Sequence, residues 1–233
     1  MHRRAGRQPP QKTERGSVIA DVMAGIRRSA AHAPQRKSAA DGDVLRDVFR
    51  AIEGDALPER RDRALLALGF AAALRRSELV ALDRADLRRV PEGLRVTIRR
   101  SKTDQEARGA EIAVPEGRRL RPVALVEAWL TAAGISQGPV FRRLSKDGAK
   151  VLAAPMSDRA VARVVQRRVA AAGYDPAAFA GHSLRAGFLT SAARAGASIF
   201  KMREVSRHRT LQVLADYVRD ARIFDDHAGK DFL

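Results

Sequence analysis

The sequence predicts a mainly α-helical protein with one small antiparallel β-sheet, an α+β fold. Three observations support this class. Apolar residues recur at helical spacing through most of the chain, alternation of period two is confined to residues 87–114, and proline and glycine punctuate the periodic segments. The 233 residues suffice for one sizeable core with an appendage. We expect a basic segment at 1–40, a main domain at 41–220 and a tail at 221–233.

The first 40 residues contain one helical pattern. Ser17 is a capping residue type, and Val18, Ile19, Val22, Met23 and Ile26 follow it as an apolar stripe. Residues 33–40, which include Pro34, are expected to form a linker.

In the main domain, capping residues and prolines precede the helical patterns. Asp41 and Ser157 are N-cap types, and Pro58 and Pro122 suit the first helical turn. The helices we expect cover residues 42–52, 58–72, 76–82, 122–130, 158–172, 183–195, 199–205 and 211–218. The expected strands are 87–90, 94–98 and 112–114, with a turn at 101–109 between the last two.

The charge of the chain indicates its partner. The formal net charge is +17 and the isoelectric point is about 11.4, which is typical of proteins that bind a polyphosphate. A basic surface that only keeps the protein in solution is the alternative. Aromatic residues make up only 5 % of the chain, so few side chains are available to stack on unpaired bases. Binding to the backbone of double-stranded DNA is therefore the better match.

The composition also excludes several kinds of chemistry. With no cysteine, the chain has no disulfide, no reactive thiolate and no cysteine zinc site. The five histidines show no close metal-ligand spacing. The basic N-terminus lacks the apolar core of a signal peptide, and the longest apolar run, 64–74, is too short to span a bilayer. We expect no metal, no cofactor and no membrane contact, and a cytoplasmic location is allowed.

Two histidines in the second half of the chain have notable partners. His182 and Arg185 are three residues apart, so on a helix they share one face and can reach one anion. His208 and Tyr217 are nine apart, about 900° of helical rotation, so an unbroken helix points them to opposite sides. A helix start at Thr210 would remove this conflict. Each pair alone also has an ordinary explanation. His182 and Arg185 fit a capping histidine and a surface arginine, and Tyr217 fits a boundary tyrosine with a solvated hydroxyl.

Two basic sites lie earlier in the chain. Lys102 falls in the expected hairpin turn, where a lysine is either simply solvated or placed to enter a DNA groove. Arg75 and Arg76 are adjacent and point about 100° apart, so helical geometry does not choose between them. Glu78, three residues after Arg75, can hold its guanidinium by a charge-assisted bond.

Together these segments resemble the tyrosine recombinases, the family of phage integrases and Xer-type enzymes. The segment LRRSEL at 74–79 resembles the first family block and selects Arg75 over Arg76. The lysine of SKTD at 101–104, the segment HSLR at 182–185 and the nine-residue step to the tyrosine match the other blocks. Ala73 and Arg207 stand where glycine is common in the family. The six matching positions, in order, are Arg75, Lys102, His182, Arg185, His208 and Tyr217.

The resemblance implies a catalytic-domain fold of that family and a metal-free transesterification. Tyr217 would attack a DNA phosphate and form a 3′-phosphotyrosyl bond. Arg75, Arg185 and His208 would stabilise the phosphate oxygens, Lys102 would be the general acid, and His182 would assist as base or orienter. We expect further DNA contacts from basic neighbours of these residues, namely Arg76, Arg99, Arg100, Arg207 and Arg209.

The resemblance also implies partners. In relatives the C-terminal tail docks on a neighbouring protomer, so we expect residues 221–233 to support a tetrameric synapse on DNA, although a tail folded on its own domain is the alternative. Residues 1–40 are expected to hold the last helix and the linker of a truncated DNA-clamping domain. Two other functions stay open, a type IB-like topoisomerase and a catalytically idle DNA-binding remnant. A bacterial or phage origin, with association to the nucleoid, is the expected setting.

Overall fold

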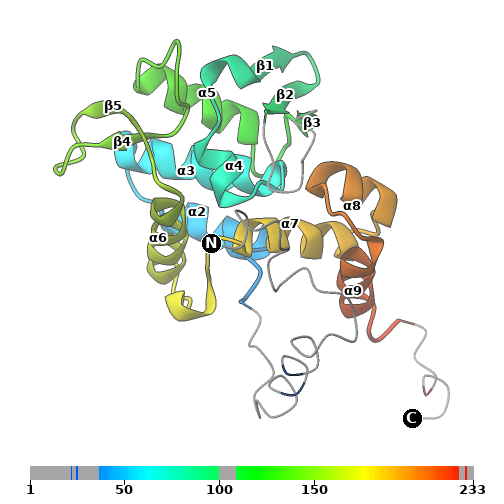
Figure 1. The fold of residues 1–233 in the computed structure, drawn as a ribbon. Coiled ribbons are helices and arrows are strands. Elements are labelled where there is room, and N and C mark those ends of the chain that lie inside the picture. Colours follow the sequence, from blue (N-terminus) through cyan, green and yellow to red (C-terminus); the bar gives the residue numbers. More distant parts are fainter. Residues whose placement is uncertain (1–21, 23–24, 26–36, 100–108, 226–228, 230–233) are drawn as a thin grey trace. The chain divides into compact units, whose positions relative to one another are not determined.

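The computed structural model describes residues 37–99 and 109–225, together with the single positions 22, 25 and 229. The chain divides into two units, Met1–Arg36 and Lys37–Leu233. The second unit is mainly helical with small antiparallel sheets, which confirms the predicted fold class (Figure 1). Of the helix expected after Ser17 the structure describes only positions 22 and 25, and the expected hairpin lysine, Lys102, lies outside the described residues.

The helices of the second unit begin and end close to the predicted positions. They are α2 Gly42–Ala51, α3 Leu57–Ala71, α4 Arg76–Val80, α5 Pro122–Ala132, α6 Asp158–Ala171, α7 Ser183–Arg194, α8 Ile199–Ser206 and α9 Leu211–Ala221. The side chains of Asp41 and Ser157 accept hydrogen bonds from the first turns of α2 and α6, as predicted. Thr210 is the N-cap residue of α9, but its side chain makes no capping hydrogen bond. The break between His208 and Tyr217 is therefore present.

Two antiparallel sheets accompany the helices. Strands β1 Leu87–Val90, β2 Gly93–Ile98 and β3 Ala110–Pro115 form a meander beside α5 (Figure 1). Val96 pairs with Ile112 and is fully buried, so the predicted alternation does place one face of this sheet on the core. A second hairpin, β4 Arg142–Leu144 with β5 Val151–Pro155, was not predicted. Its strands are short and largely exposed, so they give little periodic signal.

Helix α7 is the central support of the second unit. It contacts α2, α3, α8 and α9 (Figure 1). Residues 38–42 lie along α7 instead of forming a free linker. The Ser38 N–H donates to the Ala178 carbonyl, the Ala40 N–H donates to the Ser183 carbonyl, and Ala40 is buried. We call this segment the 38–42 strap.

The strap needs a glycine on α7. A Cβ atom added at Gly187 would lie 1.9 Å from the Ala40 carbonyl oxygen, a backbone atom that cannot rotate away. The strap is further fixed by a bond of 2.9 Å from the Gly42 N–H to the Ser191 hydroxyl and by the Arg194–Asp41 ion pair of 2.6 Å. The N-terminal side of the domain is thus bonded to the helix that carries Arg185.

A buried acid ties α3 to α6. Asp62 is fully buried, and its two oxygens accept from Arg61 on its own helix and from Arg167 and Arg168 on α6. Arg168 also pairs with Glu59 at 3.1 Å. A buried carboxylate is tolerated because guanidinium groups satisfy both of its oxygens.

We predict that Gly187→Ala destabilises the domain. Alanine favours a helix over glycine by about 1 kcal/mol, but the clash with the strap should outweigh this and lower the free energy of unfolding by about 2 kcal/mol. Chemical denaturation measures the difference. Gly42→Ala is the matched control, because the added Cβ would meet only the Ser191 hydroxyl at an ordinary 3.5 Å. Equal stability of the two variants would contradict the strap packing.

Candidate active site

The first part of the site is the Arg75–Glu78 pair at the start of α4. Arg75 is the extended N-cap residue, and Glu78 accepts a hydrogen bond from its backbone N–H at 2.9 Å. The Arg75 Nη1 atom donates to Glu78 Oε1 at 2.5 Å, the bond that the three-residue spacing predicts. The Glu78 side chain is only 2 % exposed. The carboxylate therefore orients both the backbone and the guanidinium of Arg75.

Glu78 has a second cationic partner, Arg207. The Arg207 Nη2 atom donates to Glu78 Oε2 at 2.7 Å, and its Nη1 donates to the Val205 carbonyl at 2.7 Å. Its side chain is 12 % exposed, so the guanidinium points inward. This differs from the expected surface contact with DNA. Arg207 is the C-cap residue of α8 and has a left-handed backbone, with φ of 57°, which the sequence did not predict.

The charges around Glu78 decide its ionisation. Burial alone would raise the pKa of the carboxyl, but the charge of Arg207 and the hydrogen bonds and charge of Arg75 outweigh it, so the pKa is lowered. Burial lowers the pKa of Arg207, and Glu78 opposes that shift. The carboxylate is therefore ionised at neutral pH and acts as the counter-ion of the two arginines.

Arg185 brings α7 into the site. It is 6 % exposed, and its Nη1 donates to the Ala73 carbonyl at 2.7 Å. Ala73 has φ of 45°, in the left-handed region, which explains why glycine is common at this position in the resembling family. Burial, followed by the charges of Arg75 and Arg207, lowers the pKa of Arg185 to about 9. The guanidinium still carries its charge at neutral pH.

His208 is oriented by Ser206, a residue that sequence reasoning missed. The His208 Nδ1 atom lies 2.8 Å from the buried Ser206 hydroxyl and 3.3 Å from Arg185 Nη2. A guanidinium only donates, so Nδ1 is the acceptor and the proton of the neutral ring sits on Nε2. Burial, and then the charges of Arg185, Arg75 and Arg207, lower the pKa of His208 to about 4. A neutral ring with an Nε2–H donor is the result.

Tyr217 completes the site from α9. Its ring is half-buried and packs against a small core that includes Leu189, Met202 and Leu214. Because α9 begins after the break at Thr210, the tyrosine turns back toward α7 and the Arg185 side chain.

These groups line one cavity of about 190 Å³. Five of the six positions selected by the family resemblance meet there, and Lys102 lies outside the described residues. The cavity is smaller than a typical pocket for a drug-sized molecule and suits one phosphate group. Its lining residues are Arg75, His182, Arg185, Ala186, Leu189, His208 and Tyr217. His182, the exposed N-cap residue of α7, makes no capping hydrogen bond with its side chain.

Arg76, Arg99 and Arg209, which were also expected to touch DNA, do not line this cavity. Arg76 pairs with Asp158 at 3.2 Å, and Arg99 pairs with the buried Asp86 at 2.6 Å. Arg209 is exposed, and Arg100 is outside the described residues. The structure therefore brings Arg75, and not Arg76, into the site, the choice made by the resemblance.

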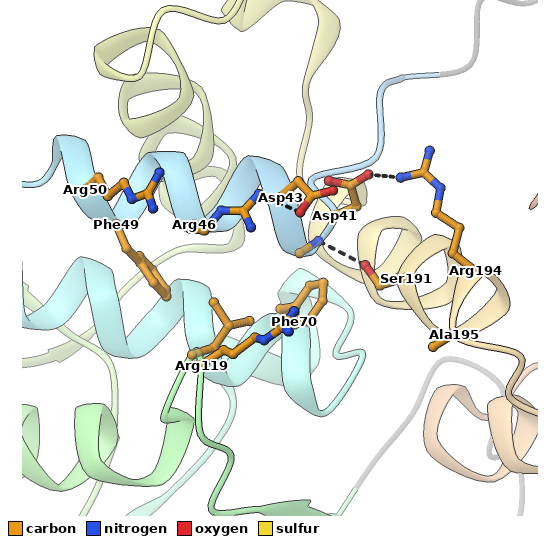
Figure 2. A pocket seen from close by; sticks show the side chains of 12 residues that line it. Asp41, Asp43, Arg46, Phe49, Arg50, Phe70, Arg119, Ser191, Arg194 and Ala195 are labelled. Atoms are coloured by element: carbon orange, nitrogen blue, oxygen red, sulfur yellow. Dashed lines mark hydrogen bonds and ion pairs between the residues drawn. The ribbon is translucent and has the colours of Figure 1, made fainter.

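A larger cavity, of about 910 Å³, lies between α2, α3 and α7 (Figure 2). Phe49, Phe70 and Leu120 supply apolar surface, and its rim includes the Asp41–Arg194 pair. None of the five clustered site residues lines it.

No group of three or more His, Cys, Asp or Glu side chains in the described segments is placed to hold a metal ion. None of the helices in the same segments is long and apolar enough to cross a membrane.

Comparison with known proteins defines the family. Residues 41–222 match the phage integrase family, and the chain belongs to it. A curated relative, the "Integrase/recombinase xerD homolog" of Selenomonas ruminantium, is 34 % identical over 226 residues, which are 96 % of this chain and 65 % of that protein. The "Tyrosine recombinase XerD" of Xanthomonas axonopodis pv. citri (strain 306) is 32 % identical over 172 residues, 70 % of this chain and 52 % of that protein. The chain thus spans about half to two thirds of these relatives.

Solved structures share the fold. The XerH site-specific recombinase bound to palindromic difH substrate in a post-cleavage complex matches with a TM-score of 0.64 and 16 % identity, over 85 % of this chain and 53 % of that one. A lambda integrase (75-356) dimer bound to a COC′ core site matches with a TM-score of 0.56 and 19 % identity, over 88 % and 65 %. The predicted recombinase catalytic-domain fold is confirmed.

We predict that His208 makes the domain sensitive to mild acid. The folded ring resists protonation until about pH 4, whereas the unfolded ring takes up a proton near 6.5. Acid therefore favours the unfolded state between these values, and stability should fall as the pH drops through this window. Urea denaturation of the wild type and His208→Gln at a series of pH values measures the effect. An unchanged pH slope in the variant would contradict the assigned neutral ring.

Proposed function

We propose that this protein is a site-specific DNA recombinase that cuts and rejoins strands through a 3′-phosphotyrosyl intermediate. The observation that supports this best is the convergence of Arg75, Arg185, His208 and Tyr217 on one phosphate-sized cavity. Family membership and relatives whose names identify them as recombinases support the same reading.

In the proposed reaction, the Tyr217 hydroxyl attacks the scissile phosphorus. A tyrosine–phosphorus bond forms as the bond to the 5′-oxygen breaks, so one phosphodiester replaces another. Arg75 and Arg185 present planar donor forks to the non-bridging oxygens, and the Nε2–H of His208 adds a third donor. These fixed donors stabilise the negative charge that develops on the phosphorane.

Two protons must move during this step. A free tyrosine has a pKa near 10 and is a weak nucleophile at neutral pH. We assign His182, at the N-terminus of α7, to accept or relay the tyrosine proton. Lys102 would donate a proton to the leaving 5′-oxygen. Because the phosphotyrosyl bond conserves the energy of the cleaved bond, a second 5′-hydroxyl can attack it, rejoin the strand and regenerate the tyrosine.

The proposed substrate is double-stranded DNA, for which the net charge of +17 supplies a long-range attraction. We assign the exposed Arg209, beside His208, to the flanking backbone. The setting we propose is the cytoplasm of a bacterium, in association with the nucleoid. Site-independent relaxation of supercoils would favour the topoisomerase reading instead.

Self-association on DNA forms part of the proposal. We assign residues 221–233 to dock on a second protomer, and the cavity in Figure 2 is the proposed acceptor. Four arginines and two aspartates line that cavity, so its lining carries a net positive charge. The tail carries a net negative charge, with Asp225, Asp226 and Asp231 against Arg222 and Lys230, and its Phe232 suits the apolar surface.

Tyr217→Phe tests the nucleophile. A pool of nicked duplexes with randomised centres, from which the short fragment with the new 5′-hydroxyl diffuses away, should yield a covalent adduct with the wild type and none with the variant. Denaturing electrophoresis detects the adduct, and sequencing of the trapped DNA identifies the site. Wild-type failure with every duplex would support the idle remnant. An adduct that persists in the variant would refute the assigned nucleophile.

Arg185→Ala should slow adduct formation by about a hundredfold or more, the cost of losing one transition-state donor. Single-turnover rates on the trapped sequence measure it. Arg163→Ala removes the same charge from the exposed face of α6 and should keep the saturating rate. A wild-type rate for Arg185→Ala would remove Arg185 from the mechanism.

Loss of residues 226–233 should abolish DNA-induced tetramers and leave the Tyr217 adduct intact. Analytical ultracentrifugation with the trapped duplex measures the assembly. Arg119→Glu, on the acceptor cavity, should weaken assembly in the same way by reversing one charge. Normal tetramers in both variants would show that the tail and this cavity do not join protomers.

A further inference from the structure

Arg207 occupies a backbone conformation that does not suit it. Among the described residues, only Ala73, Arg121 and Arg207 have positive φ without being glycine. A left-handed conformation costs a residue with a side chain about 1 kcal/mol or more. Such strain persists where surrounding contacts favour it, which makes the contacts of this side chain informative.

The side chain of Arg207 reaches from the end of α8 into the base of the active site. Its Nη2 is 2.7 Å from Glu78 Oε2, and its Nη1 is 2.7 Å from the Val205 carbonyl and 3.4 Å from the Ala72 carbonyl. The Arg207 and Glu78 side chains are 12 % and 2 % exposed. This is a charge-assisted bond shielded from water, and its partner is the carboxylate that orients Arg75.

We propose that Arg207 is a positioning residue, which acts through Glu78 to fix the guanidinium of Arg75 and to hold the His208 turn beside it. The effect of Arg207 on a reaction rests on the proposed recombinase function. Arg207 itself lines no part of the cavity, so it acts on the reaction through its neighbours.

The two oxygens of Glu78 explain how this works. Oε1 accepts from the Arg75 guanidinium, and Oε2 accepts from the Arg75 backbone N–H and from Arg207. With Arg207 on Oε2, Arg75 reaches the carboxylate through Nη1. Without Arg207, a bidentate Arg75–Glu78 pair is favoured, and it would turn the donor fork of Arg75 toward Glu78 and away from a phosphate.

If Arg207 acted only through its charge, its removal would have the opposite effect on the site. The charge of Arg207 opposes the charged form of Arg185 and the protonated form of His208. If Arg207 acted only as one more cation beside these groups, its removal would relieve repulsion and would not disturb Arg75. Positioning and simple repulsion therefore give different results for one variant.

Arg207→Met and Arg207→Lys are the informative pair. Both replacements are unbranched and meet the same strain at φ of 57°, so the backbone contribution cancels between them. Methionine keeps the apolar stem and loses the charge, whereas lysine keeps a cation for Glu78. Arg203→Met, one turn earlier on the exposed face of α8, removes the same charge away from Glu78 and is the control.

Single-turnover adduct formation on the trapped duplex gives the main readout. Arg207→Met should lower the saturating rate by about tenfold or more, because a misplaced catalytic group costs up to about a hundredfold. The half-saturating DNA concentration should change by no more than about threefold, the effect of one surface charge. Arg207→Lys should recover most of the rate and Arg203→Met should keep it. A wild-type saturating rate in Arg207→Met, or no recovery with lysine, would overturn the proposal.

The pH profile separates positioning from a merely structural role. Arg75 at the start of α4, Arg207 after α8 and Arg185 on α7 face Glu78, and each favours its carboxylate. Removal of Arg207 should raise the pKa of Glu78 and that of His208, which the charge of Arg207 also lowers, so the acid limb of the rate profile should move to higher pH. A lower melting temperature with an unmoved acid limb would mean that Arg207 only stabilises the fold.

A readout without DNA keeps this inference distinct from the proposed function. Carbon-13 NMR of the Glu78 carboxyl should show a higher titration midpoint in Arg207→Met than in the wild type or Arg203→Met. If the wild type forms no adduct with any duplex, the recombinase proposal fails, and this titration still tests the link between Arg207 and Glu78. Equal midpoints would refute that link.

Discussion

The candidate active site depends on one buried carboxylate. Arg75 and Arg185 line the cavity, Arg207 lies behind them, and the mutual repulsion of the three guanidinium groups must be offset. Glu78 does this from below the cavity, by accepting from two of the three guanidinium groups with its separate oxygens. Burial of the acid alone would favour its neutral form, but the arginines reverse that preference. The Glu78 carboxylate and the neighbouring arginines thus stabilise one another's charged forms.

The same electrostatics explain the state of His208. The guanidinium groups that suit a phosphate also disfavour a protonated imidazole, so the ring is neutral and uses its Nδ1 to accept from Ser206. The remaining Nε2–H is a donor aimed by that bond. The site therefore presents charged forks and one neutral donor, a set of groups that complements a phosphate with developing negative charge.

The fold holds these groups through α7. Arg185 lies on this helix, the Tyr217 helix packs on it, and the 38–42 strap lies along it where Gly187 leaves room. The Asp62 network fixes α3 against α6. Catalytic groups on rigid elements keep their geometry better than groups on loops.

Sequence patterns predicted the regular elements well and the polar contacts less well. Caps at Asp41 and Ser157, and the alternation in β2 and β3, are local signals, and the structure follows them. The β4–β5 hairpin was missed because its strands are short and exposed, although Asp147-Gly148 is a common turn pair that could have indicated it.

The site itself shows the same division. The residues that meet in the cavity were selected by their family spacing, and helical geometry correctly required a break before α9. The inward path of Arg207 could not be predicted, because it depends on a left-handed backbone and on a carboxylate 129 positions away in the sequence. Ser206 was missed for a similar reason, since a serine beside a histidine gives no signal until their orientation is known.

The most direct test of the account is whether one small phosphate analogue engages all of these groups together. Orthovanadate, which adopts the trigonal-bipyramidal geometry of a phosphorane, can be titrated into the protein while NMR follows the His208 and Tyr217 rings and the Arg75 side chain. The account predicts that the three sets of signals move together with one dissociation constant, and that none moves in Arg185→Ala. Signals that move separately, or that still respond without Arg185, would show that the cavity is not a single phosphate site.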